Sequence, residues 1–134
     1  MLLGVDPLLR GAALQALDEM GHGDVLLICD ANFPAKKMPG VTIDMPGIDG
    51  PSASRAIAAH FPIDPEEPVT VMATPDGAVT DVQKELAATF GLDESALELV
   101  DRHEFYDRAG EAQVIIHSGE MRKFANLLVR KGVI

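Results

Sequence analysis

Two residues suited to acid–base chemistry flank the apolar segment Val25–Cys29. His22 lies before it, between two glycines, and Asp30 follows it directly. Loops beside strand ends are where α/β proteins usually carry their chemistry. A histidine near a carboxylate, with no metal pattern around it, favours proton transfer on a small polar molecule. The ordinary alternatives are a loop or helix-capping role for His22 and a turn-capping role for Asp30.

Two further polar residues stand at predicted junctions of elements. Arg102, with His103 beside it, lies between a predicted strand and a predicted helix, and Asn126 precedes an apolar strand. A solvated charge or an ion pair would explain Arg102, and a turn would explain Asn126. Each of these residues, taken singly, is weak evidence for a site.

The sequence matches none of the common cofactor or nucleophile motifs. It has no P-loop or dinucleotide fingerprint, and Ser118-Gly119 does not fit a nucleophile elbow. No two of the four histidines lie at metal-ligand spacing. We therefore expect neither a metal nor a cofactor. The four histidines are His22, His60, His103 and His117.

Composition narrows the class of partner. The net charge of −10 and the pI near 4.6 disfavour nucleic acid and anionic membranes as partners. Cys29 is the only cysteine, so we expect a buried small side chain and an intracellular, cytoplasmic protein. No apolar run approaches the ~20 residues of a membrane-spanning helix, and no signal peptide is evident. The 134 residues fit a single domain, 1–134.

Predicted helices and strands alternate along the chain, which indicates a layered α/β sandwich. Asp6-Pro7 predicts the start of the first helix and Gly21 its end, and Thr80 and Gln83 predict a capping box before the third helix. The apolar run 25–29 predicts a strand covered on both faces. The other predicted strands are 41–43, 69–73, 97–100, 114–116 and 127–129, and the other predicted helices are 52–61, 80–91 and 103–109.

Taken together and in order, five segments resemble the ribose pyranase and fucose mutarotase family (RbsD/FucU). The similarity runs from about residue 4 to the C-terminus, and the ordered spacing makes it specific. The resemblance implies a mostly parallel central sheet flanked by helices. The matching segments are Glu19–Asp24, Asp30–Pro34, Arg102–Ala109, Ser118–Glu120 and Phe124–Val133.

The resemblance also implies an enzyme that interconverts the ring forms of a free monosaccharide without a cofactor. His22 takes the position of the catalytic acid/base, and Asp30, Arg102, Phe124 and Asn126 take sugar-binding positions. Arg102 followed by Phe-Tyr-Asp-Arg-Ala resembles the fucose branch, so L-fucose is favoured over ribose and galactose. The family further implies a homo-oligomer, up to a decamer, with its sites at subunit contacts.

Two positions depart from the family pattern. Phe124 stands where tyrosine is common, and Asn32 stands where a histidine can occur. Three other functions fit the same residues: a non-catalytic sugar-binding or transport accessory protein, a structural oligomer with a decayed site, and a metal-dependent aldose isomerase. Sugar binding, anomer exchange and sensitivity to a chelator distinguish these alternatives.

Overall fold

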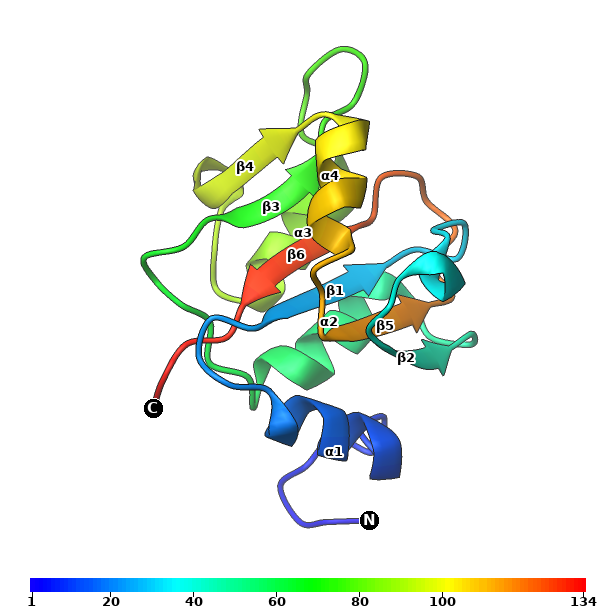
Figure 1. The fold of residues 1–134 in the computed structure, drawn as a ribbon, viewed down its shortest axis with the longest axis vertical. Coiled ribbons are helices and arrows are strands. Elements are labelled where there is room, and N and C mark those ends of the chain that lie inside the picture. The colour runs from blue at the N-terminus through cyan, green and yellow to red at the C-terminus, as the bar shows by residue number, and fades with distance from the viewer.

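A six-stranded sheet forms the centre of the computed structural model, which describes residues 1–134 (Figure 1). The strand order is β2-β5-β1-β6-β3-β4, and only β6 runs antiparallel to its neighbours. The expected mostly parallel sheet flanked by helices is confirmed. The strands are β1 (Val25–Cys29), β2 (Val41–Met45), β3 (Val69–Met72), β4 (Leu97–Val100), β5 (Val114–Ser118) and β6 (Leu127–Arg130). The helices are α1 (Gly11–Glu19), α2 (Gly50–Ala58), α3 (Asp81–Thr89) and α4 (Arg102–Ala109).

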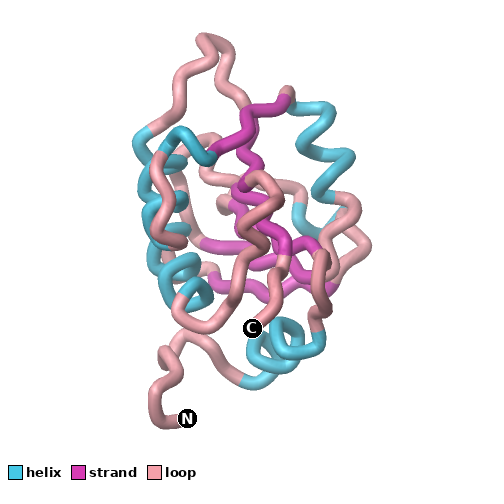
Figure 2. Tube along the Cα trace, turned by 90° about the vertical axis from the view of Figure 1, so that its left-hand side faces the viewer, coloured by secondary structure: helices cyan, strands magenta, loops and turns pink.

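Helices cover both faces of the sheet, as Figure 2 shows. All five residues of β1 are buried, which confirms the prediction of a strand covered on both sides. Its side chains alternate between two cores, because successive residues of a strand point to opposite faces. Leu26 and Ile28 join the larger core, with α1, α2 and α3, and Leu27 and Cys29 join the smaller core, with α4.

Two predicted helix starts are wrong. The carboxylate of Asp6 accepts a hydrogen bond from the Leu8 amide, which closes a separate turn, and α1 begins only at Gly11. In contrast, α2 begins two residues before the predicted Ser52, because Asp49 is its N-cap and Pro51 is tolerated in the first turn. The capping box of Thr80 and Gln83 at α3 is confirmed.

The topology brings distant parts of the chain to one edge of the sheet. Because β6 is antiparallel to both β1 and β3, the five other strands point the same way, and β6 starts where they end. Asp30, Arg102 and Asn126 therefore lie toward the carboxyl edge of the sheet. His22 precedes β1 and lies at the opposite edge. None of the helices is long and apolar enough to span a bilayer.

Candidate functional site

A buried carboxylate–amide pair occupies the carboxyl edge of the sheet. The Asp30 amide donates to Asn126 Oδ1 at 3.0 Å, and Asn126 Nδ2 donates to Asp30 Oδ2 at 3.0 Å. Both residues are buried, each 4% exposed. They meet because Ile28 at the end of β1 pairs with Leu127 at the start of β6. The structure thus joins two of the sequence candidates that are 96 residues apart.

Opposing effects act on the charge of Asp30. Burial raises the pKa of its carboxyl group, because the charged form loses hydration, while hydrogen bonds from Asn32 and Asn126 lower it. The Asn32 amide donates to Asp30 Oδ1 at 3.0 Å, so Asp30 also caps a turn, as the ordinary alternative predicts. A carboxylate fixed in this way is a hydrogen-bond acceptor suited to a sugar hydroxyl.

The backbone of Phe124 adopts an unusual conformation next to this pair. Its φ of +64° makes it the only non-glycine residue of the chain with a positive φ. Gln83 Nε2 donates to the Phe124 carbonyl at 3.2 Å and to the Met72 carbonyl at 2.8 Å. The Phe124 side chain packs against the smaller core. The buried amide of α3 therefore holds the segment that presents Asn126.

Replacing Gln83 with alanine should destabilise the fold by about 2–4 kcal/mol, because two carbonyls lose their donor and a cavity forms. The side chain of Gln83 is fully buried and also completes the capping box of α3. Urea unfolding measures this loss. Gln15→Ala is the matched control, because Gln15 bonds only the exposed Glu19, and it should change stability by less than about 0.5 kcal/mol. Equal losses for the two variants would contradict the structural role of Gln83.

Arg102 is the first residue of α4, directly after the N-cap Asp101, and takes part in none of the ion pairs of the chain. It is exposed. One helical turn further, the Tyr106 ring lies 5.5 Å from the Phe33 ring, centroid to centroid. Phe33 follows Asp30 by three residues, so this contact joins the start of α4 to the Asp30 segment. The Arg102 guanidinium is free to donate to a ligand.

His22 lies far from this group of residues. Its Nε2 is 3.0 Å from Asp64 Oδ2, and its side chain is 62% exposed. The full length of β1 separates it from Asp30, which at about 3.3 Å per residue is roughly 16 Å or more. Within one chain Asp30 therefore cannot orient His22. The side chain that contacts His22 is Asp64, 42 residues away in the sequence, and the acidic segment Asp64-Pro65-Glu66-Glu67 is the only feature of the sequence that marks it.

The Asp64 carboxylate is held in its charged form. Hydrogen bonds from the Glu66 amide and from His22 keep the pKa of Asp64 below its usual value. An ionised Asp64 holds one ring nitrogen of His22 and leaves the other free. This is the arrangement in which a histidine with a fixed orientation transfers a proton from its second nitrogen.

An apolar groove of about 620 Å³ begins at His22 and runs between α1, the end of α2 and the C-terminal residues. Lys131 crosses it, donating from Nζ to the carbonyls of Leu17 and Met20 at 2.9 and 2.6 Å. The groove is bounded by both chain ends, which carry exposed apolar side chains. These exposed residues are Met1, Leu2, Leu3, Val133 and Ile134.

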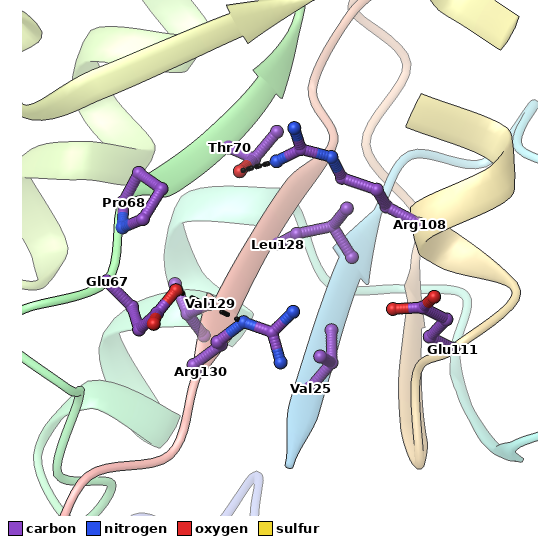
Figure 3. Close-up of a pocket in the computed structure, with 9 residues that line it drawn as sticks. All are labelled: Val25, Glu67, Pro68, Thr70, Arg108, Glu111, Leu128, Val129 and Arg130. Atoms are coloured by element: carbon purple, nitrogen blue, oxygen red, sulfur yellow. Dashed lines mark hydrogen bonds and ion pairs between the residues drawn. The ribbon is translucent and has the colours of Figure 1, made fainter. Parts of the chain in front are cut away.

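A second, smaller cavity of about 60 Å³ lies between α4, β1, β3 and β6 (Figure 3). Arg108 pairs there with Glu98 at 2.9 Å, and Arg130 lies 3.5 Å from Glu67. Both guanidinium groups are thus neutralised by carboxylates. None of the sequence candidates lines this cavity, which we interpret as a structural ion-pair network. No three metal-ligating side chains of the chain cluster together.

Close backbone contacts fix the strand that borders Asp30. Ser118 Oγ donates to the Cys29 carbonyl at 2.7 Å, and the Ala31 amide donates to the Glu120 carbonyl at 2.9 Å. A Cβ atom on Gly119 would lie 2.1 Å from the Pro46 carbonyl oxygen, so only glycine fits there. The segment Ser118–Glu120 therefore supports the Asp30 loop from beside it.

Comparisons with known proteins identify the family and support the fold. The sequence model of the RbsD / FucU transport protein family matches residues 3–134. An L-fucose mutarotase of Actinobacillus pleuropneumoniae is 36% identical over 99% of this chain and 97% of its own. The crystal structure of FucU from Bifidobacterium longum superposes with a TM-score of 0.89, at 33% identity, covering 98% of this chain and 99% of that one. A fucose mutarotase from Streptococcus pneumoniae, solved in complex with L-fucose, gives a TM-score of 0.87 at 26% identity, covering 99% of each chain.

Proposed function

The chain belongs to the RbsD/FucU family, and on this basis we propose that it is an isomerase that interconverts the anomers of a free monosaccharide, L-fucose. The observation that carries the proposal is the buried Asp30–Asn126 pair, with the unpaired Arg102 at the same edge of the sheet after β4, a set of acceptors and donors suited to sugar hydroxyls. Relatives that cover nearly the whole chain are L-fucose mutarotases.

The reaction opens a cyclic hemiacetal and closes it on the other face. One group takes the proton of the anomeric hydroxyl, and a proton is delivered to the ring oxygen. The open-chain carbonyl then rotates, and closure reverses both transfers. In this proposal His22 moves the proton while Asp64 orients its ring, and Asp30, Arg102 and Asn126 hold the sugar hydroxyls. Acid–base catalysis of this kind gives about 10²–10⁴-fold.

A complete site on this proposal needs two copies of the chain. His22 lies at the opposite edge of the sheet from Asp30, yet its side chain is 62% exposed and reaches outward. We therefore propose a homo-oligomer in which His22 of one copy meets Asp30, Arg102 and Asn126 of the next. The apolar groove beside His22 and the exposed apolar chain ends supply a surface for such a contact. A cytoplasmic location is part of the same proposal.

Phe124 has a mild effect on this site in our proposal. Its side chain packs against the smaller core, and its backbone carries the strained conformation that places Asn126. Phe124→Tyr should therefore change the KM for L-fucose by less than about threefold, which is below the value of a full new hydrogen bond. Initial rates of anomer exchange over a range of L-fucose concentrations measure this. A tenfold lower KM in the variant would show that the missing hydroxyl limits sugar binding.

Saturation-transfer NMR on equilibrated L-fucose tests the function directly. We expect the protein to accelerate exchange between the two anomeric proton signals. The same measurement on ribose and on galactose tests which sugar the protein prefers. A transport accessory protein is the second candidate, favoured by the description of the matching family as transport proteins. Saturable binding of L-fucose without faster exchange would support that candidate and reject the mutarotase.

A further inference from the structure

A histidine that the sequence analysis did not place in the site lies directly beside it. His117 is on β5, in register with Cys29 of β1 on one side and Asp44 of β2 on the other. Its side chain is 23% exposed. The register places it at the carboxyl edge of the sheet, one residue short of the level of Asp30.

Both ring nitrogens of His117 face hydrogen-bond acceptors. Nδ1 lies 3.0 Å from Asp44 Oδ1, and Nε2 lies 3.3 Å from the carbonyl oxygen of Ala31. A backbone carbonyl only accepts, and so does an ionised carboxylate. A neutral imidazole carries one N–H and one lone pair, so it can satisfy only one of these contacts. The doubly protonated ring satisfies both.

The Asp44 carboxylate, which faces Nδ1 of His117, keeps its negative charge. Lys36 Nζ donates to Asp44 Oδ2 at 2.6 Å, and this contact together with His117 holds the pKa of Asp44 below its usual value. On the other side, burial raises the pKa of the neighbouring Cys29 thiol, which is therefore neutral. The titratable groups bonded to His117 or paired with it across the sheet are thus the Asp44 carboxylate, with its lysine, and the neutral Cys29 thiol; Asp30 lies one residue beyond Cys29.

The Ala31 peptide links His117 to the proposed sugar site. Its carbonyl accepts from His117, its amide donates to Glu120, and it joins Asp30 to Asn32, whose own amide holds the Asp30 carboxylate. A shift of this peptide would move Asp30 relative to Asn126. His117 makes no hydrogen bond to any of the proposed sugar-binding side chains and would act through the backbone.

We infer that doubly protonated His117 is a positioning residue that bridges Asp44 and the Ala31 carbonyl and thereby fixes Asp30 for sugar binding. This inference rests on the proposed sugar site. When the second proton is lost, the ring can no longer donate to both partners, and the Asp30 segment loosens. Sugar affinity is therefore higher when both ring nitrogens of His117 carry a proton than when only one does.

The test is the affinity for L-fucose between about pH 5.5 and about pH 8.5, the range in which histidine charge changes. In the wild type we expect Kd to rise about three- to tenfold across this range, the range of a single hydrogen bond. His117→Gln should show a weaker affinity that no longer depends on pH. The control His103→Gln, on the exposed face of α4, should keep the wild-type profile. Protonation of Asp30 would instead weaken sugar binding as the pH falls, which is the opposite pH dependence.

The protonation state of His117 is measured independently of any variant. Long-range ¹H–¹⁵N correlation of its side chain should show protons on both nitrogens wherever affinity is highest. A singly protonated ring at that pH, or an unchanged pH profile in His117→Gln, would overturn the inference even if exchange is catalysed. Conversely, a pH-dependent affinity without any catalysed exchange would retain the role of His117 and reject the mutarotase.

Discussion

His22→Ala should lower the rate of catalysed L-fucose anomer exchange by about 10²–10⁴-fold, the usual contribution of a positioned acid–base group. The expected loss lies in kcat, because in this proposal His22 moves the proton while Asp30, Arg102 and Asn126 hold the sugar hydroxyls. The fold should be unaffected, since the side chain is largely exposed and its only polar contact is Asp64. Saturation-transfer NMR gives the rate, and thermal unfolding gives the stability.

A matched control for His22→Ala is His103→Ala. His103 is also exposed and lies on α4. The stability of both variants should lie within about 0.5 kcal/mol of the wild type. If His22→Ala retained exchange close to that of His103→Ala, His22 would not be the essential proton carrier. If both variants lost exchange equally, the loss would not be specific to the position of His22.

Much of the fold follows from short-range patterns. The apolar run Val25–Cys29 matches the observed β1, because a continuous apolar run signals a doubly covered strand. The predicted strand Leu97–Val100 also matches the observed β4, an edge strand that is buried only at its two ends. The capping box at Thr80 is local and was equally readable. The start of α1 could not be predicted in this way, because Asp6 suits an isolated turn as well as it suits an N-cap. Only the packing of the chain decides between those two uses.

In the candidate site, too, the sequence indicates individual residues, whereas the contacts between them depend on the fold. The sequence order indicated Asp30 and Asn126, but their mutual hydrogen bonds depend on β6 running antiparallel to β1. Asp64 as the contact of His22 and Gln83 as the support of Phe124 arise from pairings 42 and 41 residues apart. No local spacing encodes such contacts. His117 gains its two partners only through the register of β5 with β1 and β2.

Mixing two inactive variants should restore activity if each site is shared between copies. His22→Ala retains the sugar-binding edge and lacks the proton carrier, whereas Asp30→Ala retains His22 and lacks the acceptor. After the two proteins are unfolded together and refolded at equal amounts, a contact is intact when one copy supplies His22 and the next supplies Asp30. With random assembly the chance is about one half times one half, so we expect about one quarter of wild-type exchange.

The size of the recovery distinguishes the possible arrangements of the site. A site contained in one chain cannot be repaired by mixing, because every chain of the mixture lacks one of its two groups. Recovery near one quarter therefore requires His22 and Asp30 to act across a contact, as the length of β1 between them demands. Refolding of each variant alone is the control and should give no recovery. If mixing also gives none while the mixed oligomers form, His22 and Asp30 do not act across a contact between copies, and the shared-site proposal is wrong.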